Sequence, residues 1–249
     1  MDEFISEKVL IGKDTKIGLN VIIEDNVKIG DNCLIGHNVI IHEGSEIGGG
    51  VRIDDGTIIG KEPLFSPRSI FKPKKFNPAK IGDDCLIGAN VVIYVGSVIG
   101  HKNLIADLST IRENVTIGDV NIIGRNVTIE NFVTIGSRCK FETNVYITAY
   151  SEVGDYCFVA PCVATSNDNY MARDKERYKH FKGVTLKTGA RIGVNATILP
   201  GKIIYEDGMV AAGSVVSRDV PKGKIVLGCP AKVHRDVNEK QLLKNNLDK

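Results

Sequence analysis

A hydrophobic residue, usually isoleucine, recurs every six residues along most of this chain. One run extends from Ile11 to Ile59 without a miss, a second from Ile81 to Thr165, and a third from Leu186 to Val216. A period of six is typical neither of an amphipathic helix nor of a simple alternating strand. It is typical of a parallel β-helix, in which short strands stack as successive coils. The repeat therefore predicts an all-β chain.

Each repeat also carries a smaller residue four positions after the isoleucine, with polar residues or glycine between them, as in "IGDNCLIGHN". Isoleucine suits a pleated surface that is buried on one side, whereas Gly and Asn tolerate the positive φ angles of tight corners. Three such sides would close a triangular coil of about 18 residues, giving about ten coils with ~4.8 Å between stacked strands. Four cysteines occupy the smaller inward position, where we expect buried apolar residues rather than zinc ligands, disulfides or reactive thiols: Cys33, Cys85, Cys139 and Cys157.

The repeat first breaks at residues 61–80, a segment rich in proline, phenylalanine and cationic residues. Proline keeps such a segment out of a sheet. Cations interleaved with aromatic rings could hold a phosphorylated, ring-bearing ligand, and we expect Arg68, Lys74 and Lys75 to contact it. The alternative is a solvated flap whose Phe residues pack on the wall of the solenoid.

The second break, residues 166–185, is polar and contains Asn167, Asp168 and His180. Long loops on a rigid scaffold are often functional. With about 18 residues per coil, Asn167 should lie above Asn131 on an outward face. The alternative is that Asn and Asp merely start the loop.

The hexapeptide pattern resembles that of the left-handed β-helix acyltransferases over nearly the whole chain. The run "TSNDN" at 165–169 resembles the start of a loop that covers the active site in enzymes that acetylate nucleotide-linked amino sugars. The resemblance implies a left-handed parallel β-helix over residues 1–235 with both loops inserted, and a short helical tail over 236–249. It also implies a homotrimer with clefts between neighbouring subunits.

The segment "AAGSVVSRDVPKGKIVLGCPAKVHR", from Ala211 to Arg235, is similar to the ending of CoA-dependent members of that family. The resemblance implies that this segment contacts the coenzyme. Arg and Lys suit the phosphates of CoA. The implied contacts are Ala212, Gly213, Arg218, Lys232 and Arg235.

The resemblance implies an N-acetyltransferase that moves an acetyl or other short acyl group from acetyl-CoA to the amine of a dTDP- or UDP-linked amino-deoxy sugar, for surface polysaccharide biosynthesis. Because the sequence shows no signal-peptide pattern, we expect a cytoplasmic location. Many family members use a histidine base, but no histidine occurs between residues 102 and 179. We therefore expect direct attack by the amine, which Asn167 and Asp168 orient or relieve of its proton. Glu142 is a further catalytic candidate, and Asn144, Asn131 and His180 are candidates for holding the sugar.

Three alternatives remain open at this stage: an acyltransferase on another small-molecule amine or hydroxyl, a γ-type carbonic anhydrase-like protein, and a structural hexapeptide protein. His37 and His42 have the spacing of a hexapeptide carbonic anhydrase, but the third histidine of that pattern has no counterpart here, so we expect no metal. A net charge of +2 predicts no general affinity for nucleic acid. Because the chain has no long apolar stretch, we expect neither a signal peptide nor a membrane span.

Overall fold

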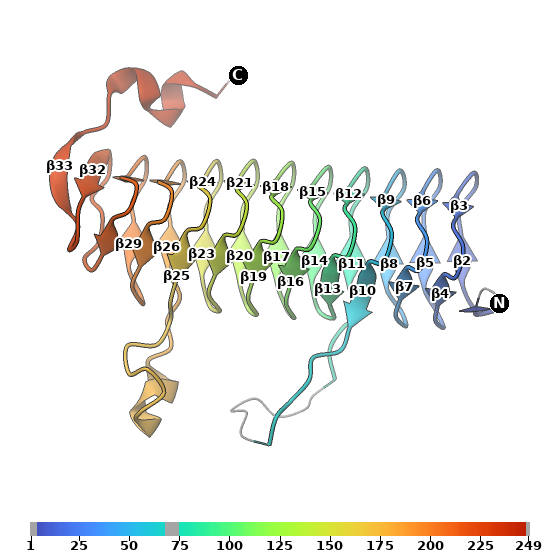
Figure 1. Ribbon diagram of the computed structural model, residues 1–249. Coiled ribbons are helices and arrows are strands. Elements are labelled where there is room, and N and C mark those ends of the chain that lie inside the picture. Colours follow the sequence, from blue (N-terminus) through green and yellow to red (C-terminus); the bar gives the residue numbers. More distant parts are fainter. Residues whose placement is uncertain (1–3, 68–74, 248–249) are drawn as a thin grey trace.

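The computed structural model describes residues 4–67 and 75–247, and it is a three-sided parallel β-helix (Figure 1). Successive strands belong to different sheets, and along most of the chain each strand pairs in parallel with the strand three places later. The three sheets, called A, B and C here, contain 11, 10 and 12 strands. The predicted fold class is confirmed.

Sheet A consists of β1 (Phe4–Ile5), β4 (Ile22–Ile23), β7 (Ile40–Ile41), β10 (Ile58–Lys61), β13 (Val92–Tyr94), β16 (Thr110–Ile111), β19 (Thr128–Ile129), β22 (Tyr146–Ile147), β25 (Ala164–Thr165), β28 (Thr197–Ile198) and β31 (Val215–Val216). Sheet B consists of β2 (Leu10–Ile11), β5 (Lys28–Ile29), β8 (Glu46–Ile47), β11 (Lys80–Ile81), β14 (Val98–Ile99), β17 (Thr116–Ile117), β20 (Thr134–Ile135), β23 (Glu152–Val153), β26 (Thr185–Leu186) and β29 (Ile203–Ile204). Sheet C consists of β3 (Lys16–Ile17), β6 (Leu34–Ile35), β9 (Arg52–Ile53), β12 (Leu86–Ile87), β15 (Leu104–Ile105), β18 (Ile122–Ile123), β21 (Lys140–Phe141), β24 (Phe158–Val159), β27 (Arg191–Ile192), β30 (Met209–Val210), β32 (Lys224–Leu227) and β33 (Lys232–Asp236).

The solenoid is longer than the ten coils that the repeat predicted. Phe4–Ile5 forms a strand before the first isoleucine of the counted run, and Lys224–Leu227 adds another after the last. The second of these is out of step with the six-residue period, because the chain from Val216 to Lys224 turns a corner with only an isolated bridge between Val220 and Ile204. A count of regular repeats therefore misses both ends.

The repeating isoleucines fill the axis of the solenoid, and most of them are almost completely buried. The four inward cysteines are also buried, as predicted, with exposed fractions of 2% or less. Burial raises the pKa of the Cys85 thiol, so it remains protonated and is a poor nucleophile. Backbone groups are paired between coils; for example, the Ile22 N–H donates to the Val39 carbonyl at 2.9 Å.

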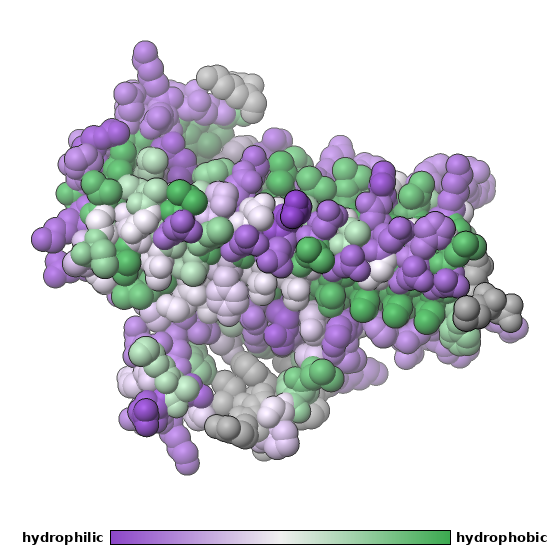
Figure 2. All heavy atoms as spheres, in the orientation of Figure 1, coloured by the Kyte–Doolittle hydropathy of each residue, from purple (hydrophilic) through white to green (hydrophobic). Residues whose placement is uncertain are grey.

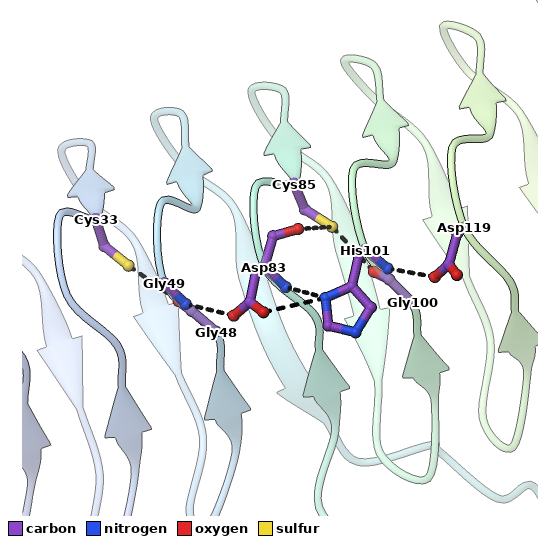
Figure 3. A network of polar contacts seen from close by, with 8 residues as sticks. All are labelled: Cys33, Gly48, Gly49, Asp83, Cys85, Gly100, His101 and Asp119. Atoms are coloured by element: carbon purple, nitrogen blue, oxygen red, sulfur yellow. Dashed lines mark hydrogen bonds and ion pairs between the residues drawn. The ribbon is translucent and has the colours of Figure 1, made fainter.

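Polar side chains at the corners tie each coil to the one before it (Figure 3). After sheet B, the Asp83 carboxylate accepts from the Gly49 N–H at 2.8 Å, and His101 Nδ1 accepts from the Asp83 N–H at 3.0 Å. Asp119 accepts in turn from the His101 N–H at 2.7 Å. His101 is therefore a member of a structural ladder that satisfies corner N–H groups.

The helical tail that the sequence predicted consists of two short 3-10 turns rather than one continuous helix. β33 pairs antiparallel with β32, and two 3-10 turns follow, η2 (Glu239–Gln241) and η3 (Leu243–Asn245). Leu242 has an extended backbone, with φ −68° and ψ 144°, so it separates the two turns and prevents a continuous helix. The Leu243 N–H donates to Asp207 Oδ1 at 2.9 Å and fastens the tail to the solenoid.

The surface of the solenoid is mixed in polarity. Hydrophobic residues lie in a row over the N-terminal coils that hold β4 and β7 (Figure 2). The outward residues of sheet A in this region are Ile22, Ile40 and Ile58, and Ile22 is 38% exposed. Among the described residues, no helix is long and apolar enough to cross a bilayer.

Candidate active site

Two loops leave the solenoid from the same sheet (Figure 1). Loop 1 (62–79) follows β10, and loop 2 (166–184), which contains the 3-10 helix η1 (Lys175–Lys179), follows β25. Since β13, β16, β19 and β22 lie between these strands, the loops begin five strand spacings, or about 24 Å, apart. We call the corner residues at the ends of these four strands edge A: residues 94–96, 112–114, 130–132 and 148–150.

Edge A carries side chains where the corners after sheet B carry glycine. A Cβ on Gly30 would lie 2.5 Å from the backbone nitrogen of Gly49, so that corner has no room for a side chain. Sheet B repeats this glycine at Gly12, Gly30, Gly48, Gly82, Gly100, Gly118, Gly136 and Gly154, whereas the corresponding edge A residues are Tyr94, Arg112, Glu130 and Thr148. This difference is visible in the sequence.

Arg112 contacts two carboxylates at edge A unequally. Its Nε lies 2.9 Å from Glu113 Oε2 and its Nη2 lies 3.3 Å from Glu113 Oε1, whereas its Nη1 reaches Glu130 Oε2 only at 3.5 Å. The Glu113 side chain is 5% exposed and that of Glu130 is 20% exposed. Burial alone would lower the pKa of Arg112, but the hydrogen bond and charge of Glu113, with the charge of Glu130, raise it above its usual value. Arg112 therefore stays charged and mainly neutralises Glu113.

Two amides at edge A have unused hydrogen-bond donors. Within the described part of the chain, neither Asn131 Nδ2 nor Asn114 Nδ2 has a hydrogen-bond partner, although both atoms are buried. Asn131 as a whole is only 6% exposed. An unsatisfied buried donor costs about 1 to 3 kcal/mol. Such groups are uncommon in folded proteins, and a ligand oxygen would satisfy them.

Aromatic rings line the same edge. Phe132 and Tyr150 stack with their ring centroids 5.4 Å apart and their planes 4° from parallel. Both have left-handed backbone conformations, with φ of 60° and 62°, at a corner position that Asn or Gly fills in many other coils. For bulky residues this conformation costs roughly 1 to 2 kcal/mol each. Other bulky residues, such as Leu108 and Val120, have the same conformation at corners elsewhere in the solenoid, so the coil geometry requires it.

Loop 2 is held together by Asp168. Its Oδ1 accepts from the Tyr170 N–H at 2.8 Å, and its Oδ2 accepts from the Ala172 N–H at 3.0 Å and from Arg177 Nη1 at 2.9 Å. Desolvation acts to raise the pKa of Asp168, but the two backbone N–H groups and Arg177 outweigh it and hold the pKa below its usual value. Asp168 is therefore an ionised carboxylate whose known partners all lie in the loop.

Edge A and loop 2 together form a cavity of about 320 Å³. That volume is at the lower end of the range for small-molecule sites. Edge A and the neighbouring strand β22 contribute Glu130, Asn131, Tyr146 and Tyr150, and loop 2 contributes Asn167, Asp168, Arg177 and Phe181.

Several of the residues predicted from the sequence meet in this cavity. Asn131 and Asn167 both line it, as the stacking of coils predicted, and Asp168 lies in its wall. His180 is exposed in loop 2, where its ring stacks on that of Tyr170 at 5.9 Å. Lys75 is exposed in loop 1. The predicted contacts Arg68 and Lys74 lie outside the described residues.

Glu142 and Asn144, which the sequence suggested for catalysis and for holding the sugar, lie outside this cavity within one chain. Both follow β21 of sheet C, so they lie on a different corner of the solenoid. Glu142 pairs with Lys140 at 2.9 Å, and Asn144 Oδ1 accepts from Asn126 Nδ2 at 2.8 Å. The physical reason is the coil length, because residues stack only when they are a whole number of coils apart.

The predicted CoA contacts are only partly brought together. Arg218 and Lys232 line one cavity of about 280 Å³, whose apolar lining includes Pro221, Pro230 and Ala231. Ala212 and Gly213 are exposed at the corner that follows β30 of sheet C. Arg235 lies on β33, where its Nη1 donates to the Asp236 carbonyl at 3.2 Å.

The histidines with metal-like spacing have other contacts. His37 Nδ1 accepts from the Leu19 N–H at 2.8 Å, after sheet C, while His42 pairs with Glu24 at 3.2 Å, after sheet A. They therefore lie on different corners. Among residues 4–67 and 75–247, no group of three or more His, Cys, Asp or Glu side chains could hold a metal ion.

Family models match the repeats directly. The bacterial transferase hexapeptide (six repeats) matches residues 8–43. The hexapeptide repeat of succinyl-transferase matches residues 26–61, 78–106 and 114–149. The matched segments fall within the N-terminal two thirds of the solenoid and stop before loop 2.

Among curated proteins, the chain is similar to 2,3,4,5-tetrahydropyridine-2,6-dicarboxylate N-acetyltransferases. It is 55% identical to that of Clostridium perfringens over 49 residues, covering 20% of this chain and 21% of the relative. It is 41% identical to that of Staphylococcus aureus over 64 residues, covering 26% of this chain and 27% of the relative. The chain thus matches only about a fifth to a quarter of the length of these relatives.

Among solved structures, the fold is similar to that of two UDP-N-acetylglucosamine acyltransferases. The Arabidopsis enzyme has a TM-score of 0.67 at 21% identity, with 98% of this chain and 75% of that chain covered. The Francisella novicida enzyme has a TM-score of 0.55 at 21% identity, with 98% and 72% covered. The matches show that the chain contains hexapeptide repeats like those of bacterial transferases and shares the β-helix fold of these enzymes.

Proposed function

We propose that the protein is an acyl-CoA-dependent N-acyltransferase whose acceptor is the amine of a dTDP- or UDP-linked amino-deoxy sugar. The observation that carries this proposal is the cavity between edge A and loop 2, with the unpaired amide of Asn131 beside stacked aromatic rings. An amide donor suits a sugar hydroxyl, and aromatic rings suit the apolar face of a sugar or a base. The names of the relatives, N-acetyltransferase and UDP-N-acetylglucosamine acyltransferase, support acyl transfer.

We place the binding site of the co-substrate, acyl-CoA, at the C-terminal end of the solenoid. Arg218 and Lys232 supply positive charge for the phosphates of CoA, and Pro221, Pro230 and Ala231 supply an apolar surface for its adenine. The fit of these residue types to a phosphorylated, ring-bearing molecule supports the assignment. Ala212 and Gly213 remain candidates for the pantetheine arm, because a corner without bulky side chains admits a narrow chain.

The proposed reaction is direct attack of the neutral amine on the thioester carbonyl. The nitrogen–carbon bond forms, the carbon–sulfur bond breaks, and the amine proton ends on the departing thiolate, which yields an amide and free CoA. Asn167 lines the cavity and orients the amine. Asp168 holds loop 2 over the site through its contacts with Arg177 and the loop backbone.

We further propose a homotrimer that works in the cytoplasm. The trimer is supported by the row of apolar outward residues on the N-terminal part of sheet A, which includes Ile22, Ile40 and Ile58. Packing against a second copy would remove this apolar surface from water. Light scattering at micromolar concentration tests the assembly, and a monomeric mass contradicts it.

The activity is tested by thiol release from acetyl-CoA in the presence of a panel of dTDP- and UDP-linked amino sugars, each paired with its hydroxyl analogue. We expect release with at least one amino sugar and none with its analogue. Release with hydroxyl sugars would make the protein an O-acyltransferase. No release with any acceptor, together with no binding of CoA, would favour a structural hexapeptide protein.

A further inference from the structure

We propose that Glu130 is the group that holds the acceptor amine, and that Arg112 and Glu113 are positioning residues that keep its charge available. The inference rests on the proposed function, because it names the part of the acceptor that the cavity selects. It extends that function by specifying a cationic primary amine next to a hydroxyl, rather than a hydroxyl alone or a carboxylate.

The first argument is the balance of charge in the cavity. Asp168 pairs with Arg177 at 2.9 Å, and Glu113 holds Arg112 through two contacts. Each of these pairs is close to neutral. Glu130 meets Arg112 only at 3.5 Å, so its negative charge is the least compensated of the carboxylates at the cavity. A partly buried carboxylate of this kind is complementary to a cation.

The neighbouring Tyr146 phenol has a hydrogen bond with Glu130 but supplies no opposite charge. Burial, followed by the charge of Glu130, raises the pKa of Tyr146 above its usual value, so the ring stays neutral. Burial and the charge of Glu113 likewise raise the pKa of Tyr150. The two tyrosines therefore supply hydroxyl groups and ring faces, and Glu130 is the least compensated charge that lines the described cavity.

The second argument is independent of charge. Asn131 is the next residue after Glu130 and lines the same cavity, and its Nδ2 is buried without a hydrogen-bond partner. An amide donor beside a carboxylate matches an acceptor oxygen beside an amine. An amino group with a neighbouring hydroxyl is the arrangement that an amino sugar presents.

The charge near edge A also changes along its length, from positive near loop 1 to negative at Glu130. Lys61 lies at the loop 1 end, with its Nζ 5.0 Å from the centre of the Tyr94 ring. It is three strand spacings, or about 14 Å, from the coil of Glu130. A ligand with an amine at one end and a phosphate at the other matches these charges, with the amine at Glu130 and the phosphate at Lys61. A small dicarboxylate, such as the compound named for the curated relatives, would place negative charge against Glu130.

Before the transfer step, the ammonium held by Glu130 releases one proton to solvent, and the neutral amine then attacks the thioester carbon. When the amine nitrogen bonds to the thioester carbon it becomes positively charged and its N–H becomes acidic. The proton passes to Glu130, the carbon–sulfur bond breaks, and the leaving thiolate takes the proton from Glu130. The carboxylate is thus regenerated without any further reactant.

The test is a binding measurement that needs no catalysis. Calorimetry should compare each amino sugar nucleotide with its hydroxyl analogue, for the wild-type protein, Glu130→Gln and Glu142→Gln. We expect at least one pair for which the wild type prefers the amine by about tenfold or more, since hydrogen bonds to charged groups are strong. Glu130→Gln should lose this preference. Glu142→Gln, on another corner and paired with Lys140, should retain it.

The outcomes separate this inference from the proposed function. If Glu130→Gln keeps the preference, or if the wild type shows none with any pair, Glu130 does not hold the amine. If the preference depends on Glu130 but no acyl group is transferred, the assignment of Glu130 stands and the proposed N-acyltransferase activity fails.

A second variant tests the positioning role. Glu113→Gln frees Arg112 to neutralise Glu130, so the amine should bind more weakly while the hydroxyl analogue binds as before, and Glu113→Asp should restore part of the preference. A purely structural role would weaken both probes equally, and that result would overturn the role given to Glu113. Both measurements are made at a temperature where circular dichroism shows the variant to be folded.

Discussion

Arg177 donates from its Nη1 to Asp168 Oδ2 at 2.9 Å, and this contact closes loop 2 across nine residues. The backbone N–H groups of Tyr170 and Ala172 bind the same carboxylate. Asp168 therefore organises the loop that covers the cavity, in addition to any contact with a ligand. The role of Asp168 in holding loop 2 together can therefore be measured separately from any role in the reaction.

Replacing Asp168 or Arg177 by Ala should expose loop 2 to proteases. The pair holds the loop together, so its loss should loosen loop 2 and raise the rate of cleavage by roughly tenfold. Limited proteolysis followed by mass spectrometry measures this rate. Glu176→Ala is the matched control, because Glu176 pairs with Lys179 in an exposed position in the same loop.

The pH dependence of the loop follows from the lowered pKa of Asp168. A carboxyl group whose pKa is lower in the folded state contributes its full stability above the ordinary pKa of 3.8 and loses it as the pH falls through the folded value. Protection of loop 2 should therefore be constant from pH 5 to 8 and decline only in stronger acid. Protection that already declines between pH 7 and 5 would contradict this assignment.

Catalysis should not depend on His180. Its ring is exposed and stacks on Tyr170. His180→Ala should keep most of kcat, whereas Asn167→Ala should lower kcat/KM by roughly tenfold, about 1.4 kcal/mol of transition-state stabilisation. The measurement is kcat/KM across pH 6 to 9, with an acid limb set by the sugar amine. If His180→Ala is inactive and Asn167→Ala is normal, the loop carries a histidine base.

Arg218→Ala and Lys232→Ala should each raise KM for acetyl-CoA several-fold and leave KM for the acceptor nearly unchanged. These side chains line one cavity, and their attraction to phosphates should weaken as salt is added. Arg235→Ala is the comparison, since Arg235 is exposed on β33 and its Nη1 donates to the backbone carbonyl of Asp236. An equal effect of all three variants would indicate only a diffuse electrostatic attraction.

Two adjacent glycines should respond differently to a methyl group. A Cβ on Gly48 would lie 2.7 Å from the backbone nitrogen of Asp83, whereas a Cβ on Gly49 would find its nearest atom, the Asp31 carbonyl oxygen, at 3.4 Å. Gly48→Ala should destabilise the protein by about 1 to 3 kcal/mol through overpacking. Gly49→Ala should change the free energy of unfolding by less than about 0.5 kcal/mol or stabilise the protein slightly. Urea unfolding with matched m-values measures both.

The sequence predicted the parts of the site that depend only on stacking. Asn131 and Asn167 line one cavity, as expected from coils of constant length. The same rule, applied to Glu142, would have separated it from Asn167, because the two residues are not a whole number of coils apart. Edge A could also have been recognised, since the glycine that repeats after sheet B is replaced there by Tyr94, Arg112 and Glu130.

The sequence by itself determined the backbone, because every coil repeats the same short-range pattern of inward isoleucine, small residue and polar corner. Only the tertiary structure decided how the side chains at edge A are paired. Arg112 is one residue from Glu113 and one coil from Glu130, and both are within reach of its guanidinium, so the sequence cannot tell which carboxylate it prefers. The answer depends on burial, which is nearly complete for Glu113 and partial for Glu130. A buried charge costs more to leave unpaired, so Glu113 takes the cation and Glu130 faces the cavity.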